Sequence, residues 1–131
     1  MDSKTELQIQ KAKNLLTSGE VVAFPTETVY GIGANVFDVS AIKKIFDIKK
    51  RPQENPLIAH ISSPEMLTTL VSEISPTNQI LIDSFWPGPL SIVFPKRPEV
   101  PSVVTAGLDT IVVRFPSHPI AQRLISDCGF P

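Results

Sequence analysis

The chain has 131 residues, a formal net charge of -1, and 42% hydrophobic and 19% charged residues. This length and composition indicate one soluble globular domain with a single core, and they exclude a protein that coats nucleic acid by bulk positive charge. The single cysteine excludes an internal disulfide, and the polar residues 1–10 together with the lack of a long apolar run predict a cytoplasmic protein without a signal peptide or membrane span.

The first predicted element is an amphipathic helix that starts at Thr5 and stops at Gly19. Its apolar positions are expected to face the core, and they are Leu7, Ala12, Leu15 and Leu16. A short buried strand is predicted next, over residues 21–24, and Pro25 ends it.

The segment PTETVYGIGA (25–34) follows this strand and is typical of a turn with hydroxyl-to-backbone bonds. Its glycines, Gly31 and Gly33, permit a positive φ or a close approach of another group to the backbone. A substrate-binding loop is the alternative. The segment is no dinucleotide fingerprint, because the third glycine and its helix are lacking.

The rest of the chain continues to alternate helices and strands. Asp38 or Ser40 is expected to cap the next helix, and Pro52 is expected to end it. A Ser62–Glu65 capping box and a Ser75 cap are expected to open the two helices after it. The remaining predicted elements are a helix over 40–50, a strand over 57–61, helices from 64 and 76, strands over 90–94 and 110–115, and a helix over 117–128 that ends at Gly129. This order predicts an α/β fold whose sheet is at least partly parallel.

A cationic segment, KKRPQENP (49–56), precedes the strand at 57–61. Arg51 and the lysines beside it suit phosphate oxygens, because a guanidinium can bind two oxygens and an ammonium adds point charge. The alternative is a helix end whose cations complement the helix dipole, and we prefer that interpretation for Lys43 and Lys44. For Arg51 both interpretations stay open.

Two polar residues lie within otherwise apolar strands. His60 is interpreted as a core histidine on the residues alone. Arg114 follows three consecutive branched residues, so it needs a carboxylate partner or an anionic ligand. Cys128 is expected to be a buried structural thiol. No Cys/His cluster has metal-ligand spacing, and from the residues alone we predict an α/β domain with a small anion-binding cleft.

Five blocks, in this order, carry a resemblance to a known family: FPTETVYGIGA, KKRPQENPL with the following HIS, FWPGPLSIVF, and VVRFPSHPIAQRL. The chain resembles the YrdC-type threonylcarbamoyl-AMP synthase family over about 21–131. The resemblance implies a twisted mixed parallel and antiparallel sheet with flanking helices and a concave basic cleft. It implies an L-threonylcarbamoyladenylate synthase, a nucleotidyltransferase that uses ATP, L-threonine and bicarbonate or CO2 to make threonylcarbamoyl-AMP and pyrophosphate for tRNA threonylcarbamoyladenosine modification.

The resemblance also implies roles for individual residues. Lys49 and Arg51 form a Lys-x-Arg motif that faces the ATP phosphates and acts as the catalytic pair. Further nucleotide contacts are implied for Asn55 and Thr110, and L-threonine contacts for Thr28, His60 and Arg114. No protein metal ligand is implied, and Mg2+ would be held mainly through ATP. The segments PTETVYGIGA and WPGP are hypothesised to wall the cleft.

The implied partners are the three substrates and a tRNA-modifying transferase complex that uses the product, with no membrane. Contact with tRNA or double-stranded RNA and a homodimer stay open. The residues 1–131 are interpreted as a single YrdC-like domain that lacks the C-terminal part of the family domain, with its further strand and Ser-x-Asn motif. An RNA-binding module of the same fold, an inactive fragment of the enzyme, and the carbamoyl-transfer domain of hydrogenase-maturation proteins are the alternatives.

Overall fold

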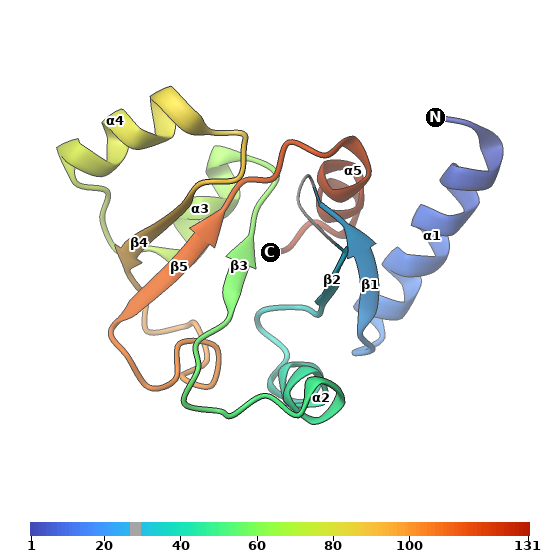
Figure 1. Ribbon diagram of the computed structural model, residues 1–131, viewed down its shortest axis with the longest axis horizontal. Helices are drawn as coiled ribbons and strands as arrows, with labels where there is room; N and C mark the ends of the chain where they lie inside the picture. Colours follow the sequence, from blue (N-terminus) through green and yellow to red (C-terminus); the bar gives the residue numbers. More distant parts are fainter. Residues whose placement is uncertain (27–29) are drawn as a thin grey trace.

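The computed structural model describes residues 1–26 and 30–131, and Figure 1 labels its elements. In chain order the elements are α1 (Ser3–Thr17), β1 (Val22–Pro25), β2 (Tyr30–Gly33), α2 (Val39–Lys49), β3 (Ile58–His60), α3 (Pro64–Leu70), α4 (Pro76–Phe85), β4 (Ser91–Pro95), β5 (Thr110–Arg114) and α5 (Pro119–Cys128). Among the described residues, no helix is long and apolar enough to cross a membrane.

Each of these helices begins where a side chain accepts a hydrogen bond from a backbone N–H group of the first turn. The capping residues are Asp2, Asp38, Ser63, Ser75 and His118. Such caps satisfy N–H groups that have no partner within the helix. The bond from the Thr5 backbone lowers the pKa of the Asp2 carboxyl, because it stabilises the charged form.

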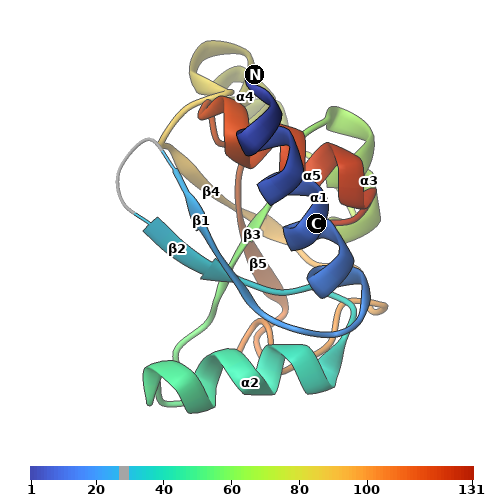
Figure 2. The ribbon, with the colours of Figure 1, turned by 90° about the vertical axis from the view of Figure 1, so that its right-hand side faces the viewer.

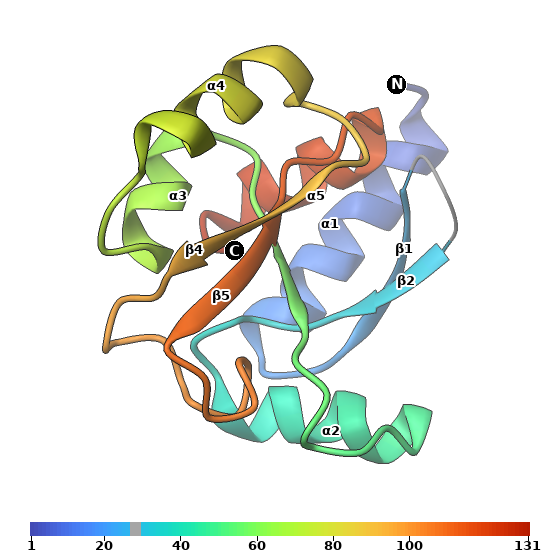
Figure 3. The same cartoon turned by 60° about the vertical axis from the view of Figure 1, so that its left-hand side comes forward.

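The strands form two separate sets of hydrogen-bonded pairs. β1 and β2 make an antiparallel hairpin. The other set is a three-stranded sheet in the order β3-β5-β4, in which β5 runs parallel to β3 and antiparallel to β4. Figure 3 shows β5 as the central strand of this sheet. The predicted α/β fold with mixed strand directions is therefore confirmed.

The helices lie around these strands, with α1 and α5 side by side next to the hairpin (Figures 1 and 2). α3 and α4 lie on the opposite side of the molecule from α1, and α2 crosses one end. A large apolar core joins the three-stranded sheet to α2 and α3, and it includes the fully buried side chains of Ile61, Leu70, Phe94 and Ile111. Burying each such side chain stabilises the fold by about 1.5–3 kcal/mol.

A second, smaller apolar cluster holds α1 in place. Its buried members are Ile9 and Leu16 of α1 and Leu124 of α5, and Phe24 of the hairpin packs against them. Leu7 and Leu15 were expected to face the core but are 72% and 39% exposed, so that prediction is wrong. The buried stripe of α1 is narrower than its apolar stripe, because among the described residues α1 packs mainly against α5 and β1.

Two more sequence predictions are corrected by the structure. The cap of α3 is Ser63 and not Ser62, because the Ser63 hydroxyl accepts the Met66 N–H at 3.3 Å while the Ser62 hydroxyl bonds to Ser126 at 2.8 Å. The residues 30–33 were expected to be part of a turn but form strand β2. The predicted cap Ser75 and the helix end at Gly129 are confirmed, and of the two caps considered for α2, Asp38 and Ser40, Asp38 is the one that caps it.

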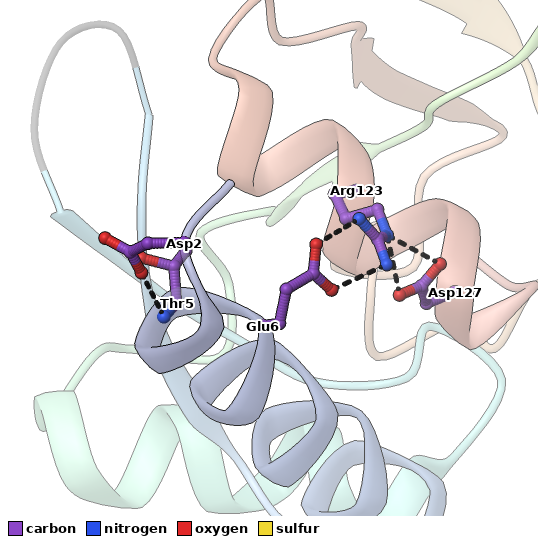
Figure 4. A network of polar contacts seen from close by, with 5 residues as sticks. All are labelled: Asp2, Thr5, Glu6, Arg123 and Asp127. Atoms are coloured by element: carbon purple, nitrogen blue, oxygen red, sulfur yellow. Dashed lines mark hydrogen bonds and ion pairs between the residues drawn. The ribbon is translucent and has the colours of Figure 1, made fainter.

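Polar contacts add to the apolar contacts between α1 and α5 (Figure 4). The Arg123 guanidinium donates to both carboxylate oxygens of Glu6 at 2.8 Å, and its Nε donates to Asp127 at 3.0 Å. The bonds to Glu6, and then those to Asp127, raise the pKa of Arg123. Because all three side chains are 29–42% exposed, solvent screens these pairs and they add little stability. Ile9 and Leu16 therefore hold α1 more strongly than the ion pairs do.

Candidate functional site

A cavity of about 320 Å3 opens where the hairpin, β3, the end of α2 and α5 meet. Four residues with predicted site roles line it, namely Lys49, Arg51, His60 and Arg114. These residues come from three separate elements and from the loop after α2. The structure therefore brings together most of the described side chains for which the sequence predicted a site role.

Arg51 reaches the cavity because α2 ends abruptly. Lys50 adopts the left-handed conformation with φ 51° and ψ 38°, and the Arg51 N–H then bonds to the Phe46 carbonyl at 3.0 Å. One terminal nitrogen of Arg51 donates to the Pro56 carbonyl at 2.8 Å. The first bond fixes the backbone of Arg51 and the second holds one end of its guanidinium, and the exposed Lys49 also lines the cavity.

Arg114 is the last residue of β5 and is held by strand pairing. It lies opposite His60 of β3 and Ser91 of β4, and its carbonyl accepts the Ile61 N–H at 3.0 Å. Its backbone is therefore fixed between two neighbouring strands. The side chain enters the cavity from the carboxyl end of the central strand, which is where α/β sheets bind ligands.

Arg51 and Arg114 share an unusual feature. The Nε atom of each is buried and has no hydrogen-bond partner in the part of the chain that the structure describes. Neither guanidinium forms an ion pair with a described carboxylate. A buried donor without an acceptor costs about 1–3 kcal/mol, and more when the group is charged. Two such donors lining one cavity favour a ligand with anionic oxygens.

His60 lies next to Arg114, on the neighbouring strand. Its Nδ1 is 3.3 Å from the Ile58 carbonyl oxygen, and its ring meets the ring of Phe24 edge to face. Thr26 also lines the cavity. Thr28, for which we predicted a threonine contact, falls at residues 27–29 and so lies outside the described residues.

Asn55 and Thr110, the two remaining predicted nucleotide contacts, do not line this cavity. Asn55 is exposed in the loop after α2, where its N–H bonds to the Pro52 carbonyl at 3.1 Å. Thr110 begins β5 opposite Pro95, so it lies about 13 Å from Arg114 along the strand. Their roles stay predictions.

Most of the cavity lining is apolar. Besides the residues above, the lining consists of Leu16, Phe24, Gly31, Ile32, Gly33, Ala34, Val36, Ile42, Ile45, Leu57, Ile58, Ala59, Val104, Leu124, Ile125, Cys128, Phe130 and Pro131. No carboxylate side chain is among these described lining residues. The three cationic side chains, Lys49, Arg51 and Arg114, therefore lie in a cavity whose lining is otherwise mostly apolar. A cleft lined mainly by positive charge stays a prediction. Residues 31–34 wall the cavity, whereas WPGP does not line it.

Cys128 was expected to be a buried structural thiol, and it is half-buried in the cavity wall. Burial raises the pKa of the Cys128 thiol. Because the thiolate is the reactive form, iodoacetamide is expected to alkylate Cys128 at pH 8 several-fold more slowly than free cysteine. The single cysteine makes mass spectrometry of the intact chain a direct measurement. A rate equal to that of free cysteine would contradict the shift.

Sequence reasoning did not assign any role to Phe24. Its ring covers Gly31 and Gly33 of the paired strand, and at Gly33 the ring comes so close that a Cβ atom would have no room. Neither glycine has a positive φ. Two glycines spaced by one residue, shortly after an aromatic residue, are the signal that could have predicted this hairpin.

These features define an α/β domain with a mostly apolar, arginine-containing cavity at the end of its central strand. The chain belongs to the Sua5/YciO/YrdC family, because the family model described as "Telomere recombination" matches residues 14–131. The predicted family is thus confirmed.

Individual relatives agree with this assignment. The threonylcarbamoyl-AMP synthase of Pyrococcus abyssi is 52% identical over 120 residues, which are 92% of this chain and 35% of that protein. The synthase of Bacillus subtilis is 46% identical over 130 residues, 98% of this chain and 38% of that protein. A crystal structure of P. abyssi Sua5 complexed with L-threonine superposes with a TM-score of 0.93 at 51% identity, and covers 96% of this chain and 37% of that chain. The chain therefore spans little more than a third of the length of these relatives.

Proposed function

We propose that this chain carries the substrate site of an L-threonylcarbamoyladenylate synthase. The reaction joins L-threonine, bicarbonate or CO2, and ATP into threonylcarbamoyl-AMP, and it releases pyrophosphate. The product would serve a partner transferase that modifies tRNA. The synthases of P. abyssi and B. subtilis, at 52% and 46% identity, support this proposal.

The observation that carries the proposal is the pair of buried Nε donors of Arg51 and Arg114 in one cavity, neither of which has a partner among the described residues. The substrates bring two kinds of anion, the carboxylate of an amino acid and the phosphates of a nucleotide. Guanidinium groups bind both kinds through two parallel hydrogen bonds. The likeness to P. abyssi Sua5, a protein whose structure holds L-threonine, supports the amino-acid half of the proposal.

In the proposed arrangement, Arg114 pairs with the threonine carboxylate, while His60 and Thr28 contact the rest of the amino acid. Arg51 and Lys49 face the ATP phosphates, and they are the catalytic pair because they would stabilise charge on the reacting phosphate. Asn55 and Thr110 are proposed as outer nucleotide contacts.

The proposed chemistry needs alignment more than a protein nucleophile. The threonine nitrogen first combines with bicarbonate to give a carbamate and water. A carbamate oxygen then attacks the α-phosphorus of ATP, the bond to the β-phosphate oxygen breaks, and pyrophosphate leaves with that electron pair. The chain's cations would hold the two anionic reactants together despite their repulsion. The apolar lining would exclude water, in which carbamates decompose.

Magnesium is proposed to accompany the nucleotide. Among the described residues, no group of three or more His, Cys, Asp or Glu side chains could hold a metal ion. This fits an ion that takes its ligands from ATP and water, since Mg2+ often binds through substrate phosphates. When bound there, it would neutralise part of the phosphate charge.

Release of pyrophosphate tests the proposal. The assay supplies ATP, magnesium, bicarbonate and L-threonine to the 131-residue chain and to a chimera, in which Pro131 is followed by the part of the P. abyssi synthase beyond the matched region. Threonine omission and L-serine replacement are the controls.

Threonine-dependent release by either protein would support the proposal. Release by the chimera alone would show that the cavity works only with the further region. A folded chimera that releases no pyrophosphate, beside an active P. abyssi synthase, would overturn the proposal.

A further inference from the structure

One aromatic ring of the hairpin connects the α1–α5 cluster to the cavity. Phe24 packs against that cluster, lines the cavity, and lies opposite Gly31 in the strand pairing. Its ring also covers Gly33. A Cβ atom added to Gly33 would lie 2.7 Å from a carbon of this ring, whereas one added to Gly31 would lie at 3.6 Å, an ordinary contact. The ring can therefore occupy its position only because residue 33 is glycine.

The same ring contacts His60. The ring centroids are 5.7 Å apart, and the rings are inclined at 85°, an edge-to-face pair. On its other side the imidazole is 3.3 Å, through Nδ1, from the Ile58 carbonyl oxygen of its own strand. Contacts of at least two different kinds therefore hold the imidazole. Rotation about the last side-chain bond of histidine has broad minima, so such contacts decide the orientation of the ring.

We propose that Phe24, seated on Gly33, is a positioning residue that fixes the His60 imidazole for L-threonine. The inference rests on the proposed function, in which His60 contacts that substrate. A ring held in the bound orientation before binding loses less rotational freedom when the ligand arrives, so affinity is higher. Phe24 itself need not touch the substrate for this effect.

The test compares two pairs of variants in the chimera. Phe24→Leu removes the ring, and Gly33→Ala displaces it without removing apolar volume. Each is expected to raise the Kd for L-threonine about three- to tenfold, the range of an aromatic pair. The control for affinity is Phe37→Leu, at an exposed phenylalanine outside the cavity. Gly31→Ala is a control for the position of the Phe24 ring alone, because its Cβ leaves that ring in place while Gly31 itself lines the cavity. Calorimetry of L-threonine binding measures Phe24→Leu, Gly33→Ala and Phe37→Leu.

A spectroscopic signal separates positioning from general stability. The Phe24 ring current shifts the imidazole proton resonances of His60. These resonances can be assigned with a His118→Gln variant of the 131-residue chain, which keeps only the His60 signals. Phe24→Leu and Gly33→Ala are expected to move these resonances, and Gly31→Ala and Phe37→Leu to leave them in place. Unmoved resonances in both test variants would overturn the inference.

A double-mutant cycle with His60→Ala completes the test. If His60→Ala leaves threonine affinity unchanged, the substrate role proposed for His60 is wrong. If His60→Ala weakens binding but Phe24→Leu and Gly33→Ala do not, positioning by Phe24 is wrong. The expected result is that Phe24→Leu weakens binding alone but adds nothing in the His60→Ala background, because the two residues act through one interaction. An additive effect would assign the ring a structural role and overturn the inference.

Discussion

Replacing Arg114 with methionine is expected to raise the Kd of the chimera for L-threonine by about 100-fold. Two charge-assisted hydrogen bonds to a carboxylate would be lost, and methionine keeps an apolar stem of similar length. The folded protein is expected to be at least as stable as its parent, with a gain of up to about 2 kcal/mol, because a buried donor that has no partner among residues 1–26 and 30–131 is removed. Calorimetry of threonine binding and urea unfolding measure the two effects.

The control for Arg114→Met is Arg123→Met. Arg123 is already paired with Glu6 and Asp127 and does not line the cavity, so its loss is expected to leave threonine affinity within twofold of the parent. An unchanged Kd in Arg114→Met would contradict the assigned role. A large loss of stability in that variant would instead show that Arg114 has a structural partner.

Replacing Arg51 with alanine is expected to raise the KM for ATP about 10- to 100-fold in the chimera, with little change in the Kd for L-threonine. The reason is the loss of a fork of donors that suits phosphate oxygens. Arg51→Lys is expected to recover only part of the affinity, because it keeps the charge without the fork. Pyrophosphate release at varied ATP concentrations measures the effect.

The control for Arg51 is Lys44→Gln. The Lys44 ammonium bonds to Glu20 at 3.1 Å and to the Gly19 carbonyl at 3.0 Å, outside the cavity, so its loss is expected to leave the KM for ATP unchanged. An equal rise in both variants would indicate a general electrostatic effect and not a phosphate contact. An unchanged KM in Arg51→Ala would remove Arg51 from the nucleotide site.

Local rules predicted much of this fold. The cap at Ser75 and the stop at Gly129 depend on a few neighbouring residues, so the sequence predicts them directly, and it narrows the cap of α2 to Asp38 or Ser40. Strand β2 could not be predicted in this way, because glycine is disfavoured in strands. It forms because the Phe24 ring, from the paired strand, covers Gly31 and Gly33. That contact does not exist until the hairpin has closed.

The candidate site shows a similar division. An arginine in an apolar strand demands a partner, so Arg114 could be singled out from the residues alone. For Arg51 the sequence left a helix-end role and a phosphate role equally open, and the buried Nε now favours a ligand. Asn55 and Thr110 entered only by resemblance, and they lie outside the cavity. Whether an arginine Nε is buried, and whether an acceptor lies near it, depends on the whole fold. A local sequence pattern therefore cannot predict either property.

The packing of α1 on α5 has a consequence for the order of folding during synthesis. Glu6 and Arg123 are 117 residues apart in the chain. At about 5–20 residues per second, a ribosome needs roughly 6–23 s to make that interval. Throughout this time Ile9 and Leu16 lack the Leu124 side chain against which they are buried in the native protein. α1 therefore docks among the last elements, and until then its apolar stripe is available to chaperones or to neighbouring nascent chains.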